Sequence, residues 1–177
     1  MVEQLNLLPH SFPSGFEFFS DFITRDEEQF LIAFARKLEW ENYEMHGVAA
    51  RRKVYRFDNE RPYPNELRPI ILKGAEALKV NLDEIIHVLF THYPIGAPIG
   101  WHRDAPMYES ILGISLGSDT TLKLRLYDSR VSPVRKIQLP ARSAYIISGE
   151  SRWEWEHHIA PVKEERFSLT MRTSRSS

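Results

Sequence analysis

The second half of the chain is a series of short segments in which apolar and polar residues alternate, and this pattern restricts the possible fold more than any other feature. In the last segment Phe167, Leu169 and Met171 fall on one face of a strand, because successive strand side chains point to opposite sides. Pro, Gly, Asp and Ser separate the segments. The strands predicted in this way cover residues 85–93, 111–116, 122–127, 136–139, 143–148 and 166–173.

Two helices are predicted before these strands. Thr24 and Glu27 form a capping-box pattern ahead of apolar residues at helical spacing, which predicts a helix over 25–37. A second helix is expected from Asn65 to Asn81, with Pro69 in its opening turns. Residues 1–19 are expected to pack on the surface as a lead-in, and residues 40–63 to form irregular strands or a hairpin.

Strands in this number after two helices predict a mainly β, α+β fold. The arrangement expected is a jelly roll of two sheets, or double-stranded β-helix, buttressed by the two N-terminal helices. A length of 177 residues fits one domain, 1–177, with its core at about 85–173.

Composition excludes several classes of site. The chain has no cysteine, so thiolate metal sites, disulfides and cysteine nucleophiles are excluded, and any metal must be held by His and carboxylate. The net charge is −1, so nucleic-acid binding would depend on a local patch such as 51–56, which could equally be a solvated strand edge. No apolar run approaches membrane-spanning length, and the first residues lack a signal-peptide pattern. We therefore expect a soluble, cytoplasmic protein without a membrane or obligate protein partner.

One short motif carries the chemistry. His102 and Asp104 are two residues apart, so in an extended segment an imidazole and a carboxylate would point to the same side. A second His from far along the chain would complete a 2-His-1-carboxylate triad, the ligand set of non-haem Fe(II) oxygenases. The adjacent residues His157 and His158 are the candidates for that ligand. Taken alone, a His-x-Asp pair is more often a surface or hydrogen-bonding pair than a metal site.

Four segments together closely resemble the AlkB family of Fe(II)- and 2-oxoglutarate-dependent dioxygenases. They are His92 to Asp104, Gly149 to Arg152, His157-x-Ile159-x-Pro161 and Arg166 to Arg172, in the family's order. The resemblance covers about residues 40–173. It implies Fe(II), 2-oxoglutarate and O₂ as cofactor and co-substrates, and oxidative N-demethylation of alkylated bases in DNA or RNA, which releases formaldehyde, succinate and CO₂. The implied biological role is dealkylation repair.

The resemblance also assigns residues to the site. His102, Asp104 and His157 would hold the metal, and His157 is chosen over His158 because the spacing to Ile159 and Pro161 matches the family. Tyr93 and Arg166 would bind the distal carboxylate of 2-oxoglutarate, with Arg172 nearer the metal. The N-terminal helices and the substrate lid that the resemblance implies would together occupy about residues 20–80, with the lid in the 40–63 region. The residues proposed to contact substrate are Trp101, Tyr55, Arg51 and Arg52, with Tyr43 and Phe57 as further aromatic candidates in the lid.

Two positions depart from well-known nucleobase-repair members of the family. Thr91 stands where those members have an Asn, and Pro106 stands where they have an acidic residue that reads the base. Two alternatives therefore remain beside nucleobase demethylation. The same oxygenase chemistry could act on a protein side chain or a small metabolite, or the domain could be a catalytically silent binding module.

Overall fold

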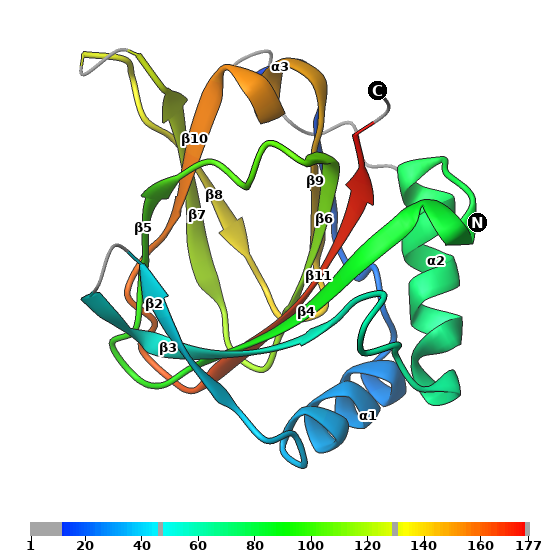
Figure 1. Ribbon diagram of the computed structural model, residues 1–177. Helices are drawn as coiled ribbons and strands as arrows, with labels where there is room; N and C mark the ends of the chain where they lie inside the picture. The colour runs from blue at the N-terminus through cyan, green and yellow to red at the C-terminus, as the bar shows by residue number, and fades with distance from the viewer. Residues whose placement is uncertain (1–11, 46–47, 129–130, 176–177) are drawn as a thin grey trace.

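Two antiparallel sheets face each other in the computed structural model, which describes residues 12–45, 48–128 and 131–175 (Figure 1). The larger sheet has the strand order β1-β9-β6-β11-β4-β3-β2, and the smaller has the order β5-β10-β7-β8. The strands of the larger sheet are β1 Phe16–Phe19, β2 Glu41–Met45, β3 Val48–Phe57, β4 Ile85–Tyr93, β6 Tyr108–Leu116, β9 Ala144–Ile147 and β11 Arg166–Ser174. Those of the smaller are β5 Ile99–His102, β7 Thr120–Leu126, β8 Arg135–Leu139 and β10 Trp155–Ile159. The predicted mainly β, two-sheet fold is confirmed.

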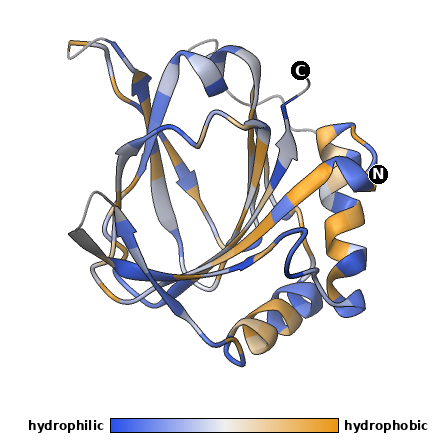
Figure 2. Cartoon of the chain, viewed as in Figure 1, coloured by the Kyte–Doolittle hydropathy of each residue, from blue (hydrophilic) through white to orange (hydrophobic). Residues whose placement is uncertain are grey.

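Helices α1, Arg25–Ala35, and α2, Arg68–Leu78, cover the outer face of the larger sheet (Figure 1). Apolar residues lie along both helices and along β4, which runs beside them (Figure 2). Leu31 and Ile71 from the two helices are fully buried in one core with the apolar face of β11. A Cβ at Gly74 would clash with Met171, so glycine allows α2 to approach the sheet closely. The helices thus seal one face of the sheet and leave the other for the site.

Both predicted helices are present, with a difference at the end of the second. The Thr24–Glu27 capping box forms as expected, and Pro69 lies in the first turn of α2 after a short 3₁₀ turn, η1 Asn65–Leu67. The predicted end at Asn81 is wrong, because Lys79 adopts a left-handed conformation (φ 60°) that terminates the helix three residues earlier. Asn81 instead caps the next turn, η2 Leu82–Glu84.

The N-terminal segment is more ordered than a surface lead-in. Phe16–Phe19 forms β1 at the edge of the larger sheet, where it pairs with β9. Residues 1–11 of that predicted segment lie outside the described residues. The 40–63 region contains the β2–β3 hairpin, with residues 46–47 outside the described range. A further short helix, α3 Gly149–Trp153, joins β9 to β10.

Strand β11 shows how the alternation positions the site. Its odd-numbered apolar residues share one face, as predicted, and this face packs against α1 and α2, while Arg166, Thr170 and Arg172 face the smaller sheet. The space between the sheets is therefore lined with polar groups on one side. In the ranges 12–45, 48–128 and 131–175, no helix is long and apolar enough to span a membrane.

Candidate metal centre

Three potential metal ligands come together at one end of the smaller sheet. Strand β10 pairs antiparallel with β5 so that His157 lies directly opposite His102. β5 ends at His102, and Asp104 follows two residues later in the irregular segment. One ligand atom from each of the three residues lies within 4.8 Å of the others. The predicted pairing of a local His-x-Asp with a distant His is therefore what the fold produces.

Both histidines are held as neutral ligands. His102 Nδ1 is 2.8 Å from the Gly100 carbonyl oxygen, so Nδ1–H donates to it and Nε2 keeps its lone pair for a metal. Burial lowers the pKa of His102, and burial together with the His102 charge lowers the pKa of His157 to about 3. At neutral pH neither ring is protonated, which is the form that coordinates a metal.

The carboxylate of Asp104 is fixed by an arginine. Arg172 donates from Nε and Nη2 to the same oxygen, Oδ1, at 2.7 and 2.6 Å. The other oxygen, Oδ2, lies 3.5 Å from His157 Nε2. Burial alone would raise the pKa of Asp104, but the Arg172 charge and the two histidines outweigh it and the pKa falls. Asp104 is therefore ionised and directs one free oxygen to the ligand cluster.

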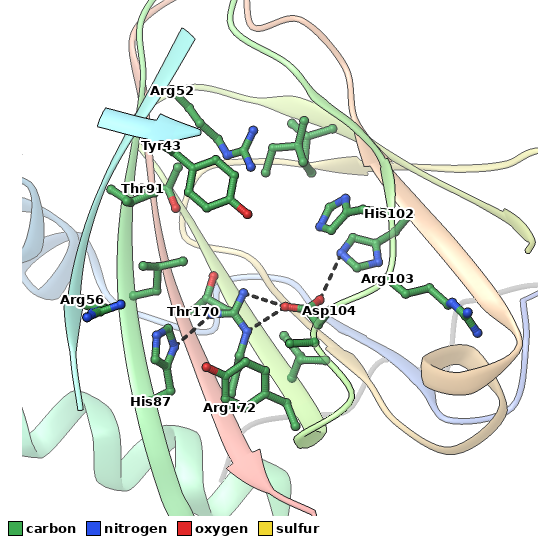
Figure 3. Close-up of a pocket in the computed structure, with 18 of the residues that line it drawn as sticks. Tyr43, Arg52, Arg56, His87, Thr91, His102, Arg103, Asp104, Thr170 and Arg172 are labelled. Atoms are coloured by element: carbon green, nitrogen blue, oxygen red, sulfur yellow. Dashed lines mark hydrogen bonds and ion pairs between the residues drawn. The ribbon is translucent and has the colours of Figure 1, made fainter. Parts of the chain in front are cut away.

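A second histidine supports Arg172 from behind. Arg172 Nη1 lies 3.0 Å from His87 Nδ1, and Figure 3 shows the line of contacts from His87 through Arg172 to Asp104. An arginine has no acceptor, so Arg172 donates and His87 must be neutral at Nδ1. Burial, with the Arg172 charge next, lowers the pKa of His87 to about 4. This keeps the accepting form at neutral pH.

The donor set fits Fe(II). Two neutral imidazole nitrogens and one carboxylate oxygen converge, and cysteine thiolate ligands are excluded by the sequence. This composition is that of the facial triads of non-haem iron oxygenases, which leave coordination positions open for small molecules.

Arg152 fixes the segment that follows the triad. Its guanidinium is buried and donates to the carbonyl oxygens of Asp104 (3.1 Å), Ala105 (2.8 Å) and Tyr108 (3.1 Å). Arg152 belongs to the segment that resembles the family pattern, but no role was predicted for it. Its place in that pattern was the only signal in the sequence, because a hydrogen bond to a backbone carbonyl requires no particular residue type at a fixed spacing.

The inner end of the site contains a buried arginine with an unused donor. Arg166 is 1% exposed, and its Nε and Nη2 donate to Ser115 Oγ at 3.3 and 3.1 Å. Nη1 is buried and has no hydrogen-bond partner in the described structure. The guanidinium carbon lies 4.7 Å from the ring centroid of Tyr93, whose hydroxyl is 3.3 Å from Ser168 Oγ. A buried free donor of this kind suits an anionic ligand, since leaving it unpaired is costly.

Tyr145 lines the pocket but was not predicted as a site residue from the sequence. Its ring lies over Gly113 on the neighbouring strand, so close that a Cβ at Gly113 would lie 2.6 Å from Cζ of the ring. Tyr145 and Tyr93 line the pocket, whereas Arg166 does not reach its surface. Burial raises the pKa of Tyr145, which is protonated at neutral pH. The pairing of a glycine with a distant tyrosine depends on strand register and could not be read from either residue.

The pocket that contains the triad has a volume of about 470 Å³. One side of it is formed by the β2–β3 hairpin, from which Tyr43 and Arg52 project above the triad in Figure 3. Glu41 and Glu44 also lie on this side, so the mouth is mixed in charge.

Three of the predicted substrate residues are not brought to the pocket. Arg51 is exposed and donates to the carbonyls of Ile95 and Gly96. Tyr55 packs against Phe57 and Arg61, and Trp101 lies against Arg125 and His158 on the outer face of the smaller sheet. Arg52 is the only one of the four that lines the pocket. Strand alternation explains the split, because Arg52 faces the opposite side of β3 from Arg51 and Tyr55, and Trp101 faces the opposite side of β5 from His102.

Comparison with known proteins points to one superfamily. The model of the 2OG-Fe(II) oxygenase superfamily matches residues 11–176. The chain is 31% identical over 183 residues to the uncharacterized protein L905 of Acanthamoeba polyphaga mimivirus, with 90% of this chain and 84% of that protein covered. It is 26% identical over 176 residues to the Xenopus tropicalis tRNA (carboxymethyluridine(34)-5-O)-methyltransferase alkbh8, with 89% of this chain covered but only 27% of that protein's length.

Solved structures share the fold at lower identity. OsALKBH1 matches with a TM-score of 0.73 and 15% identity, over 92% of this chain and 98% of the other. A Pseudomonas putida prolyl-4-hydroxylase matches with a TM-score of 0.67 and 18% identity, over 92% and 94% of the two chains. Both confirm the two-sheet architecture.

Proposed function

This chain belongs to the 2OG-Fe(II) oxygenase superfamily and is AlkB-like, and on that premise we propose that it demethylates N-alkylated nucleobases in DNA or RNA. It is an Fe(II)- and 2-oxoglutarate-dependent oxygenase with the triad His102, Asp104 and His157. The observation that carries the proposal is this triad at the base of a pocket walled by a hairpin with an aromatic side chain, Tyr43. The proposed biological role is dealkylation repair in the cytoplasm.

Each residue has a defined part in this proposal. His102, Asp104 and His157 would hold Fe(II), which together with 2-oxoglutarate and O₂ supplies the oxidising chemistry. Arg172 keeps Asp104 ionised and oriented, and Arg152 fixes the backbone after it. The protein contributes orientation and an enclosed site rather than a nucleophile or general base.

We propose that the co-substrate binds between Arg172 and Arg166. The free Nη1 of Arg166 would donate to the distal carboxylate of 2-oxoglutarate, beside the Tyr93 hydroxyl. Because Arg166 lies behind the pocket surface, the carboxylate would reach it past Tyr145. The relatives whose names refer to tRNA support a nucleic-acid substrate, and Tyr43 offers a face on which a base could stack.

The direct test is loss of the methyl group from a defined oligonucleotide. The Fe(II)-loaded protein is incubated in air with 2-oxoglutarate and single-stranded DNA or RNA carrying 1-methyladenine or 3-methylcytosine, and the product is analysed by mass. We expect methyl loss with matching succinate and formaldehyde, and none with His157→Ala. Succinate formed at the same rate with and without oligonucleotide would reject the nucleobase substrate.

A second substrate class is favoured by the mouth of the pocket. Glu41 and Glu44 stand beside Arg52 and Arg56, so the entrance is not a basic groove, and Pro106 replaces the expected acidic base-reading residue. Both features suit a protein side chain or a small metabolite. Succinate formation that oligonucleotides leave unchanged but His157→Ala abolishes would favour this class.

A further inference from the structure

Four arginines line the pocket, and three of them have partners. Arg172 is paired with Asp104, and Arg56 lies 3.3 Å from the carboxylate of Asp58. Arg103 donates to the Trp153 carbonyl at 2.8 Å and points away from the triad in Figure 3. Arg52 differs from these three. In the parts of the chain that the structure describes, its guanidinium makes no hydrogen bond or ion pair, and it stacks on Tyr43, with the guanidinium carbon 4.1 Å from the ring centroid.

This unpaired cation is also buried. Arg52 is only 7% exposed, although it lies on a hairpin at the mouth of the pocket. A buried charge without a partner is costly, and an arginine in this state is normally satisfied by a carboxylate or a phosphate. The stacking on Tyr43 holds the guanidinium in place but uses none of its donors. All five N–H groups are therefore available to a ligand.

The position of Arg52 relates it to the triad. Arg52, Val54 and Arg56 alternate along β3 toward the pocket. Arg52 and His102 line the same pocket, and Figure 3 shows Arg52 with Tyr43 on the hairpin side, across from His102 and Asp104. A ligand held by Arg52 would thus lie on the substrate side of the metal, away from Arg166 at the inner end.

We propose that Arg52, positioned by Tyr43, binds an anionic group of the substrate while the carbon to be oxidised lies at the metal. The inference rests on the proposed function and narrows its substrate class to molecules with a carboxylate or a phosphate close to the reacting methyl group. In a nucleic acid this group is either a backbone phosphate next to the target base or a carboxylate carried by a modified base. Both offer paired oxygens that match the guanidinium.

The test measures binding, not turnover. The protein is loaded with Fe(II) and 2-oxoglutarate without oxygen and titrated with two pairs of probes, followed by tryptophan fluorescence and ligand NMR. One pair is 1-methyladenosine and its 5′-monophosphate, which differ by a phosphate. The other is 5-methyluridine and 5-carboxymethyluridine, which differ by a carboxylate. The variants are Arg52→Gln, Arg52→Lys and, as the matched control, Lys53→Gln, an exposed neighbour on the opposite face of β3.

We expect at least one probe with the anionic group to bind the wild type about tenfold or more tightly than the partner that lacks this group, the usual effect of a charge-assisted hydrogen bond. Lys53→Gln should keep this preference, Arg52→Gln should lose it, and Arg52→Lys should restore part of it. The pair that shows the preference identifies the source, phosphate or carboxylate.

The inference is overturned if no anionic probe is preferred, or if Arg52→Gln keeps the preference. It is also overturned if Arg52→Gln lowers the melting temperature while the probe affinities stay unchanged, because Arg52 would then serve only the hairpin. Methyl loss from oligonucleotides together with any of these results would reject this inference and leave the proposed function standing.

Discussion

The two ends of the pocket differ in how their charges are balanced. At the metal end, Arg172 is hydrogen-bonded to both Asp104 and His87, and Arg152 donates its hydrogen bonds to backbone carbonyls. At the mouth, the β2–β3 hairpin presents Arg52 without a partner among the described residues. The charged groups at the metal end are paired within the protein, whereas the Arg52 guanidinium at the mouth is left to pair with a molecule that the protein binds.

The difference indicates a division of labour. A centre that must hold a metal in one geometry needs its ligands fixed in advance by packed and hydrogen-bonded neighbours. A substrate subsite gains affinity only if its donors are unsatisfied before binding. The metal end is therefore expected to respond strongly to mutation through stability and metal binding, and the mouth through ligand affinity alone.

The largest expected effect separates two arginines of the same pocket. Arg172→Met leaves Asp104 buried without its partner, which should cost about 3–5 kcal/mol in the free energy of unfolding. Arg56→Met removes a solvent-exposed pair with Asp58 and should cost less than about 1 kcal/mol. Urea unfolding of both variants in the presence of a chelator provides the comparison. Equal losses would show that the two ends do not differ.

Arg166→Met should weaken co-substrate binding next most strongly. Loss of a buried charge that pairs with a carboxylate costs about 2–4 kcal/mol, so the dissociation constant of 2-oxoglutarate should rise about 100-fold. Calorimetric titration of the metal-loaded protein measures this. Arg51→Met, on the far side of the hairpin, is the control and should bind 2-oxoglutarate as the wild type does. An unchanged constant in Arg166→Met would place the co-substrate elsewhere.

Gly113→Ala tests the packing of Tyr145 at the inner end. The added methyl would meet the tyrosine ring, and overpacking of this kind costs about 1–3 kcal/mol. We expect a lower melting temperature, together with weaker 2-oxoglutarate binding as the ring is displaced into the pocket. The double variant Gly113→Ala/Tyr145→Leu should recover most of the stability. If the single variant melts like the wild type, the ring does not pack there as described.

The smallest expected effect is a dependence of stability on pH through His87. Its pKa falls from 6.5 to about 4 on folding, so below pH 6.5 the unfolded chain binds a proton that the folded protein does not. Stability is therefore lost between pH 6.5 and 4, by about 1–2 kcal/mol after allowance for partial exposure of the ring. The free energy of unfolding of His87→Gln should fall less steeply than that of the wild type over this window, and the two proteins should show the same pH dependence above it. Parallel curves for the two proteins would show that His87 does not contribute to the pH dependence of stability.

Much of the metal end could be predicted from the sequence because its signals are local. The alternation of β11 gave the correct faces, and the spacing of His102 and Asp104 survives although the strand ends at His102. The capping box at Thr24 likewise located the start of α1. Strand β1 was not predicted, because its four residues include three phenylalanines and are too few to show alternation.

The mouth and the inner wall could not be predicted because they depend on pairing between distant strands. Tyr145 faces the pocket only because β9 pairs with β6 in a register that places Gly113 beneath it. On β3 a shift of one residue decides that Arg52 enters the pocket and Tyr55 does not. Both residues were predicted to contact the substrate, but nothing in the sequence determines this register.

Succinate formation by the purified protein with 2-oxoglutarate in air tests whether the triad is an oxygenase centre, when it is measured with Fe(II), with a chelator and in His157→Ala. We predict iron-dependent succinate from the wild type, suppression by the chelator, and none above background from the variant, since loss of one ligand removes the metal. Succinate from His157→Ala at the rate of the wild type would contradict the triad. Its absence from the Fe(II)-loaded wild type would contradict the assignment of this pocket as an oxygenase centre.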